Sequence, residues 1–105
     1  LGLKSAKVGT SGKALDAIVR NYIGKNKRFG KLFVHGLGHG VGIEIHEFPN
    51  INPKYDKMLS NNSVITIEPG VYEDNFAGVR IEDTIVITNK GIINLTKKAK
   101  KDFYK

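Results

Sequence analysis

The sequence predicts an α+β fold in which one helix precedes a curved antiparallel β-sheet. Apolar residues recur at helical spacing between positions 15 and 23, and from position 41 onward they alternate with polar residues in short runs. Helical spacing gathers side chains on one face of a helix, whereas alternation gathers them on one face of a strand. A chain of 105 residues suits one compact domain, so residues 1–105 are assigned to a single unit.

The predicted helix has an apolar stripe, a start signal and a stop signal. Thr10 or Ser11 can cap its first turn, and Gly24 stands where the helix should end. The stripe follows the spacing i, i+3, i+4, i+7 and i+8, and consists of Leu15, Ile18, Val19, Tyr22 and Ile23. A further helix is predicted at the basic C-terminus.

Four runs predict strands, at residues 41–46, 64–72, 79–88 and 92–95. Pro69-Gly70 interrupts the second run, and the six residues 73–78 form a plausible hairpin loop before the third. Asn89-Lys90-Gly91 predicts a turn before the fourth run. The segment 33–42 is rich in Gly and His and predicts a loop or an irregular strand, while Pro49 and Pro53 bracket a second loop.

Composition excludes several classes of protein. Apolar residues make up 40% and charged residues 26%, which is ordinary for a globular protein and argues against disorder. Cysteine is absent, so neither a disulfide framework nor a thiolate metal site is available, and a reducing compartment, the cytoplasm, is expected. No apolar run approaches the length of a membrane span, so no membrane partner is expected.

The basic balance of the chain does not by itself indicate nucleic-acid binding. The formal net charge is +7, but much of it comes from a solvated terminal segment with few interleaved aromatic residues. That segment contains Lys97, Lys98, Lys100, Lys101 and Lys105. We therefore expect no nucleic-acid partner.

All three histidines lie within one short segment. His35 and His39 are four residues apart in a Gly-rich run, and His46 follows seven residues later. Imidazole is the commonest metal-binding side chain and a proton shuttle near neutral pH, and the glycines permit close approach of backbone and ligand. A lone His in such a loop is more often a surface residue, but three together favour a functional site.

Two carboxylates fall in predicted strands, where a charge is costly unless it is paired or binds a metal. Glu68 ends the apolar run 64–67, and Glu82 lies in the run 79–88, two residues after Arg80. Periodicity alone fits equally well a solvent-facing Arg80–Glu82 pair. Because His46, Glu68 and Glu82 fall on successive predicted strands, however, their side chains can converge on a metal.

One imidazole and two carboxylates suit half of a two-metal site. Mn²⁺ favours carboxylate oxygen and tolerates imidazole, while Zn²⁺ and Co²⁺ accept both. Paired ions can activate a bridging water and polarise a scissile carbonyl. The helical HExxH pattern of single-zinc peptidases is absent.

Three motifs in this order resemble those of Xaa-Pro aminopeptidases and prolidases, which are metallopeptidases of the pita-bread fold. They are His35 to Gly42 followed by Glu44 to Glu47, then Ile67 to Tyr72, then Gly78 to Asp83. The helix around residues 15–20 also resembles the helix that precedes these motifs. The resemblance covers about Gly9 to Leu95 and implies the C-terminal half of a pita-bread catalytic domain.

The resemblance implies a role for each residue of the motifs. His39, Glu68 and Glu82 would be metal ligands, with Glu82 bridging two divalent ions, of which Mn²⁺ is expected and Co²⁺ or Zn²⁺ are alternatives. Glu68 would also shuttle a proton. His35 and His46 would position the peptide and stabilise the tetrahedral intermediate, and Arg80 would orient Glu82 and hold its pKa low. The substrate would be a peptide with Pro at its second position.

The resemblance also implies parts that this sequence does not supply. Family members have two further Asp ligands upstream of the helix, whereas the Asp residues here lie in the helix or downstream, at Asp16, Asp56, Asp74, Asp83 and Asp102. Because the sequence opens at Leu1 without an initiator Met, we expect an upstream half to be missing. The parent enzyme is expected to be a homodimer or a larger oligomer. These 105 residues alone are expected to be inactive and to expose an apolar face or edge.

Several alternatives to an Xaa-Pro peptidase stay open. A methionine aminopeptidase shares the fold and site, but it carries a different run ending in Glu-His in place of Gly78 to Asp83, and His35 also favours the Xaa-Pro group. A creatinase-like hydrolase differs partly in the missing half. A non-catalytic binding module would usually lack ligands at His39, Glu68 and Glu82. A small domain with a structural zinc on the three His residues would leave both glutamates unexplained.

Overall fold

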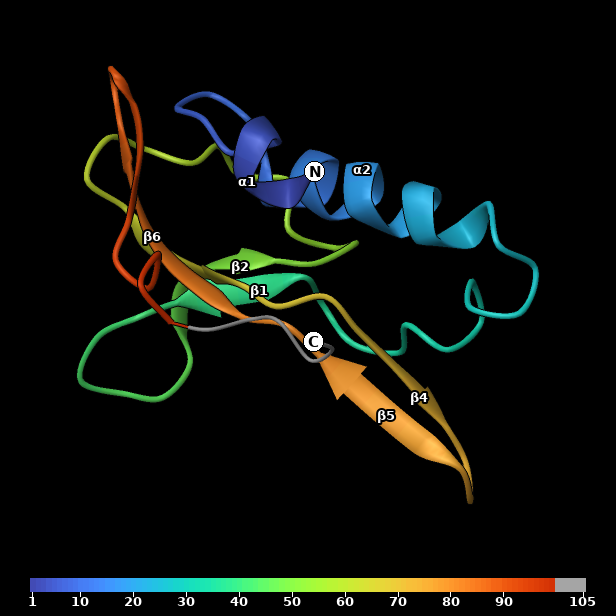
Figure 1. The fold of residues 1–105 in the computed structure, drawn as a ribbon. Coiled ribbons are helices and arrows are strands. Elements are labelled where there is room, and N and C mark those ends of the chain that lie inside the picture. The colour runs from blue at the N-terminus through green and yellow to red at the C-terminus, as the bar shows by residue number, and fades with distance from the viewer. Residues whose placement is uncertain (100–105) are drawn as a thin grey trace.

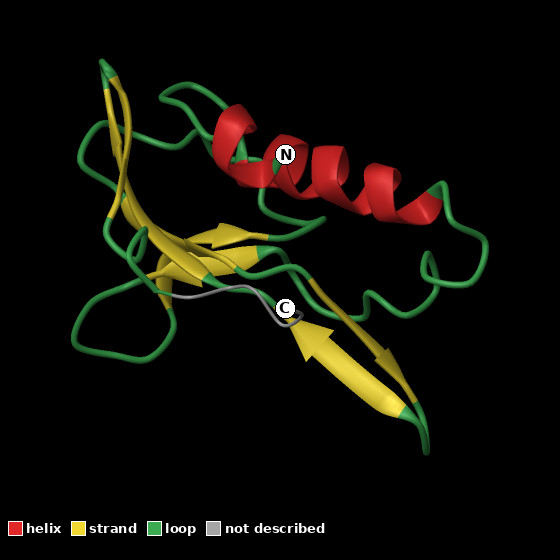
Figure 2. Ribbon diagram, viewed as in Figure 1, coloured by secondary structure: helices red, strands yellow, loops and turns green. Residues whose placement is uncertain are grey.

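A computed structural model describes residues 1–99 of the chain and contains two helices and seven strands in that range. The helices are α1 (Gly2–Ser5) and α2 (Gly12–Gly24). The strands are β1 (Gly38–Gly40), β2 (Glu47–Ile51), β3 (Val64–Ile67), β4 (Gly70–Glu73), β5 (Ala77–Arg80), β6 (Asp83–Thr88) and β7 (Gly91–Asn94). The helices form one layer over a β-sheet, and β4 and β5 project from it as a separate ribbon (Figures 1 and 2). The predicted α+β class is confirmed.

Helix α2 forms where the apolar stripe and its cap predict it. The Ser11 hydroxyl accepts a hydrogen bond from the Ala14 N–H at 3.1 Å, which satisfies one of the free donors of the first turn. Leu15 and Val19 are buried, whereas the side chain of Tyr22 is 63% exposed. Only part of the apolar stripe therefore packs against the sheet, and the rest is exposed at the surface of the described chain.

The five-stranded sheet has the order β2-β1-β3-β6-β7, and all its pairs are antiparallel. Strand β1 lies between β2 and β3. After the β1–β2 hairpin, the chain therefore forms β3 on the other side of β1, and β6 follows beside β3. Strand β3 pairs with β1 and not with β2, which leaves β2 at one edge of the sheet.

The strand predicted at residues 41–46 is wrong. These residues form a bend and are exposed, with Ile45 81% exposed, and the strand β2 follows at the position where a loop was predicted. Gly40 pairs with Glu47 on one side and with Ile65 on the other, so the chain must leave the sheet after Gly40 and return as β2. The alternation of apolar and polar residues in this connecting loop resembles strand periodicity by chance.

The two long predicted strands each break at the same level. The last pair of the β3–β6 ladder joins Ile67 to Asp83, and the first pair of the β4–β5 ladder joins Gly70 to Arg80. Two residues of each strand run lie between these pairs, outside both ladders. Pro69 has no N–H with which to continue a ladder. The run 64–72 is thus divided as expected, whereas the predicted continuous strand 79–88 is wrong.

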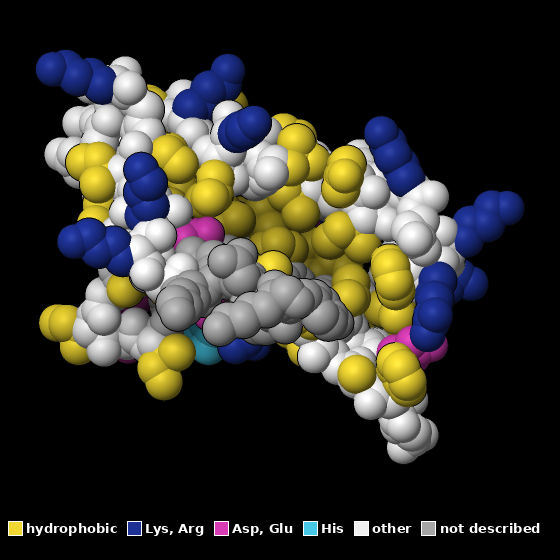
Figure 3. Space-filling view, in the orientation of Figure 1, with side chains coloured by type: hydrophobic (Ala, Val, Ile, Leu, Met, Phe, Trp, Pro, Cys, Tyr) yellow, Lys and Arg dark blue, Asp and Glu magenta, His cyan; other side chains and the backbone are white. Residues whose placement is uncertain are grey.

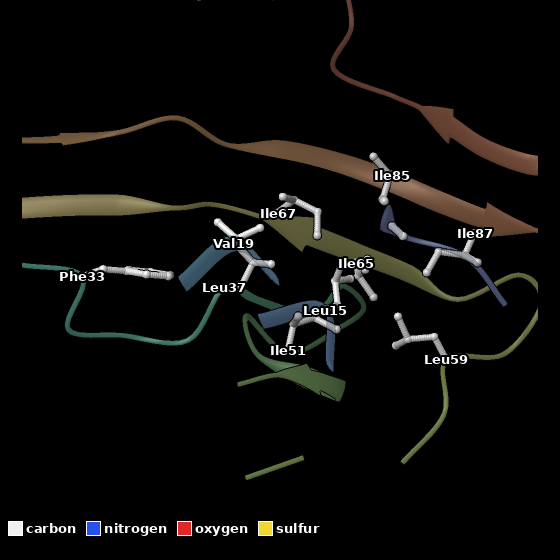
Figure 4. Close-up of a cluster of buried hydrophobic side chains, with 11 residues drawn as sticks. Leu15, Val19, Phe33, Leu37, Ile51, Leu59, Ile65, Ile67, Ile85 and Ile87 are labelled. Carbon is white, nitrogen blue, oxygen red and sulfur yellow. The ribbon is translucent and has the colours of Figure 1, made fainter. Parts of the chain in front are cut away.

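The core lies between α2 and one face of the sheet (Figure 4). Its side chains come from the helix, from the loop that follows the helix and from alternate positions of the strands, as the period of two requires. The fully buried members include Leu15, Leu37, Ile51, Ile65, Ile85 and Ile87. The described C-terminal residues after β7 form turns as far as Ala99, and the rest of the helix predicted there lies outside the described residues.

Apolar side chains also gather on the surface, in a hollow between α2 and the ribbon β4–β5 (Figure 3). Phe29, which follows α2, lines this hollow on the helix side, and Val71 and Phe76 line it on the ribbon side, with Phe76 78% exposed. Among residues 1–99, no helix is long and apolar enough to cross a membrane. Apolar side chains are therefore exposed on this face of the described chain.

Replacing Ile85 with alanine should lower the free energy of unfolding by about 2–5 kcal/mol, because the change removes three buried carbons and leaves a cavity. Ile93 on the neighbouring strand is 55% exposed and provides the control. Ile93→Ala should cost less than about 1 kcal/mol. Urea unfolding followed by circular dichroism measures both, and equal losses would contradict the described core.

Candidate active site

His39 and Glu68 form the centre of the candidate site. The His39 Nε2 lies 3.1 Å from the Glu68 Oε1, and both side chains are largely buried, with 17% and 13% of their surface exposed. Their positions are fixed through the backbone, because the Glu68 N–H donates to the Leu37 carbonyl at 2.8 Å. Strand β1, which carries His39, is thereby joined to the turn that carries Glu68.

The proton on His39 is directed by the backbone. Its Nδ1 lies 2.9 Å from the Gly40 carbonyl oxygen, which can only accept a hydrogen bond, so Nδ1 carries a proton. In the neutral ring, Nε2 is then an acceptor that faces another acceptor, the Glu68 carboxylate. Two acceptors at 3.1 Å require a cation between them, either a proton or a metal ion.

Arg80 lies between the two carboxylates of the site. Its Nε is 3.7 Å from the Glu68 Oε2 and 4.0 Å from the Glu82 Oε2. The pKa of Arg80 is raised by its hydrogen bond to Tyr72, then by the charges of Tyr72 and Glu68, and least by Glu82. The guanidinium therefore stays charged across the physiological pH range and balances the carboxylates. The Arg80–Glu82 pair that periodicity predicted is present, but Glu68 shares the same cation.

Tyr72 extends this network to His35. The His35 Nδ1 donates to the Gly36 carbonyl at 2.7 Å, which leaves Nε2 to accept from the Tyr72 hydroxyl at 3.1 Å. Tyr72 also raises the pKa of Arg80, so it interacts with both the imidazole and the guanidinium. Sequence reasoning assigned no role to Tyr72. The signal that could have identified Tyr72 as a site residue is its position in the motif Ile67 to Tyr72.

His46 reaches the site from the exposed loop 41–46. Its ring centroid lies 4.4 Å from that of His39, in an edge-to-face arrangement. An open cavity of about 500 Å³ lies between the histidines and the carboxylate. Its lining includes His35, His39, His46, Asn50, Asn52, Glu68 and Arg80. The two asparagines are site residues that sequence reasoning missed.

Glu82 is the predicted site residue that does not line the cavity. Its side chain is 44% exposed and contacts the site through Arg80. Within residues 1–99 no group of three His, Asp or Glu side chains is arranged to hold a metal ion. The structure therefore brings His39 and Glu68 together, with His35, His46 and Arg80 around them. The roles predicted for all of these residues stay predictions.

A buried ion pair on α2 fixes the backbone that leads to His35. Asp16 is 1% exposed and binds Arg20 through both oxygens, at 2.7 and 2.9 Å. Arg20 donates to the carbonyls of Phe33 and His35 at 2.8 and 2.7 Å, and Asp16 accepts from the Leu37 N–H at 3.0 Å. The guanidinium also lies over the Phe33 ring at 4.3 Å. The helix thereby holds the loop that presents the first histidine.

A protein-family comparison matches residues 1–89 to metallopeptidase family M24. The chain therefore belongs to this family of metallopeptidases. It resembles the Xaa-Pro dipeptidase of Pyrococcus furiosus, with 50% identity over 95 residues, which is 90% of this chain and 27% of that protein.

Solved structures confirm the predicted pita-bread fold class. The prolidase from Pyrococcus horikoshii OT3 superposes with a TM-score of 0.89 at 47% identity, over 95% of this chain and 28% of that one. The X-Pro aminopeptidase from Thermotoga maritima MSB8 gives a TM-score of 0.85 at 44% identity, over 91% and 27%. This chain thus spans little more than a quarter of the length of these relatives.

Asp16→Ala should lower the free energy of unfolding by about 3–5 kcal/mol, because it leaves the Arg20 guanidinium and the Leu37 N–H without their buried partner. Asp56 is exposed and provides the matched control, with an expected change within about 0.5 kcal/mol for Asp56→Ala. Urea unfolding measures both. A loss below about 1 kcal/mol for Asp16→Ala would contradict the proposed clamp on the 33–37 loop.

Proposed function

We propose that the protein carrying this chain hydrolyses the peptide bond before Pro, at a peptide N-terminus or in a dipeptide, with the help of bound divalent metal. The observation that carries the proposal is the contact of His39 Nε2 with the Glu68 carboxylate, two acceptors that need a proton or a metal ion between them. Membership of metallopeptidase family M24 and similarity to an Xaa-Pro dipeptidase support it.

His39, Glu68 and Glu82 are the residues of this chain that would hold the metal. Their donor chemistry, one imidazole nitrogen and two carboxylates, suits Mn²⁺, with Co²⁺ or Zn²⁺ as alternatives. A pair of such ions, when bound, supplies an activated water and polarises the scissile carbonyl. Two Asp ligands would come from outside these residues. Glu82 is held through Arg80, so we propose that it completes the site only when those partners are present.

The surrounding residues have roles that follow from their contacts. Glu68 lies where it can carry a proton between the water and the leaving amine, because its Oε1 faces the cavity edge beside His39. His35 and His46 flank the cavity and would orient the peptide and stabilise the tetrahedral intermediate. Arg80 stays charged and would hold the two carboxylates in place.

The 105 residues alone would be inactive under this proposal. The support is that Glu82 stands apart from the His39–Glu68 pair and that apolar side chains are exposed between α2 and the ribbon. The cytoplasmic location, the homodimer or larger oligomer and the absence of nucleic-acid and membrane partners stay predictions from the sequence.

The test is hydrolysis of matched Xaa-Pro and Met-leading peptides by the polypeptide that carries this chain at the length of its relatives, with Mn²⁺ or Co²⁺. We expect metal-dependent cleavage before Pro and a fall in kcat of about a thousandfold or more in Glu82→Ala, because a bridging ligand is lost. Glu73→Gln, which alters only an exposed pair with Arg28, should keep full activity.

Each alternative predicts a different result in the same assay. Cleavage after Met would indicate a methionine aminopeptidase. Hydrolysis of neither peptide by the metal-loaded protein would rule out the peptidase proposal and favour a creatinase-like hydrolase or a non-catalytic binding module. Equal activity of Glu82→Ala and Glu73→Gln would remove Glu82 from the metal site.

A further inference from the structure

Thr66 is a buried polar residue on the face of β3 that points away from the core. Its side chain is 3% exposed, while its neighbours Ile65 and Ile67 point into the hydrophobic cluster. A buried hydroxyl is costly unless it is hydrogen-bonded. The partners of Thr66 therefore show what the residue does.

The Thr66 hydroxyl bridges the two residues at the centre of the site. Its Oγ1 accepts from the His39 N–H at 3.0 Å and donates to the Glu68 Oε1 at 2.9 Å. The His39 carbonyl lies farther away, at 3.5 Å, and a hydroxyl has only one proton to give. The Thr66 hydroxyl therefore donates its one hydrogen bond to the Glu68 carboxylate and accepts one from the His39 N–H.

The close approach of β1 and β3 makes this bridge possible. A Cβ on Gly38 would lie 1.9 Å from the Thr66 carbonyl oxygen and 3.0 Å from its Oγ1, so no side chain fits at that position. Glycine at position 38 thus brings the His39 N–H within reach of Thr66. This close approach gives a reason for Gly38 in the His-rich motif, which the histidines by themselves do not explain.

The bridge restricts how the Glu68 carboxylate can turn. Thr66 donates to Oε1 at 2.9 Å, on the side where His39 Nε2 lies 3.1 Å away, while Arg80 is 3.7 Å from Oε2. From these contacts we propose that Thr66 is a positioning residue, which holds Glu68 against His39 for metal binding. The inference rests on the proposed function. Hydrogen bonds to ligating residues commonly change metal affinity about 10- to 100-fold.

Substitutions at position 66 separate the hydroxyl from the shape of the side chain. Thr66→Val keeps the β-branched shape and removes the hydroxyl, and Thr66→Ser keeps the hydroxyl. Thr84→Val is the matched control, because Thr84 pairs with Thr66 in the same sheet and its hydrogen bonds, to Thr96 and Leu95, run through its backbone. Thr66→Ala removes the same hydroxyl should Thr66→Val fold poorly. Urea unfolding of each variant records the purely structural cost.

The first readout is the metal-free structure of the variants in the full-length polypeptide that carries this chain. We expect Glu68 to turn away from His39 in Thr66→Val and to stay in contact in Thr66→Ser and Thr84→Val. The second readout is Mn²⁺ titration by calorimetry, in which Thr66→Val should bind about 10-fold or more weakly while the other two stay within about 3-fold.

The outcomes distinguish this inference from the proposed function. An unmoved Glu68, or unchanged Mn²⁺ affinity with only lower stability, would show that Thr66 is merely structural. A serine variant as impaired as the valine variant would also overturn the role of the hydroxyl. If the unaltered protein binds no Mn²⁺, the proposed metal site fails, whereas the metal-free structures still decide whether Thr66 positions Glu68.

Discussion

The shared register of two antiparallel strands determines where the site lies. Ile67 pairs with Asp83 before the break at Pro69, and Gly70 pairs with Arg80 after it, so the register is the same on both sides. Glu68 and Glu82 therefore lie opposite each other, and both lie beside Arg80. The Ile81 N–H donates to the Pro69 carbonyl at 3.3 Å and joins the two strands across the break. The ribbon continues this register and supplies Arg80 and Tyr72.

The hydrophobic core and the site are joined through one helix. Leu15 and Asp16 are adjacent in sequence, and the helical turn directs the first into the core and the second toward the backbone of the loop 33–37. Packing of Leu15 therefore also sets the position of the ion pair with Arg20, which holds the His35 carbonyl. A buried pair is weak support for stability as such, but here it satisfies loop groups that would otherwise be unpaired. The order of the loop thus depends on core packing.

Local patterns predicted the elements that local interactions decide. The Ser11 cap and the buried stripe of α2 are short-range features, and the break at Pro69 follows from a missing N–H. Residues 41–46 were predicted to form a strand because their sequence alternates. Gly40 pairs with both Glu47 and Ile65, so residues 41–46 must instead form the loop between β1 and β2. The pairing with Ile65 joins segments that are distant in the sequence. His39 and Glu68, which the motifs single out, lie in contact, and the roles predicted for them stay predictions. The bridging hydroxyl of Thr66 and the hydrogen bond of Tyr72 to His35 depend on tertiary register that no local pattern contains.

The charge around the site contrasts with that of the whole chain. The chain carries a formal net charge of +7, and Lys and Arg side chains project at the periphery of the face shown in Figure 3. At the site, by contrast, the carboxylates of Glu68 and Glu82 share the guanidinium of Arg80. His39 presents its Nε2, while its Nδ1 is hydrogen-bonded to the Gly40 carbonyl. Local acceptors therefore outnumber local cations although the protein is basic. Under the proposed function, a divalent ion would restore that balance, since coordination needs only acceptors and these already face one another.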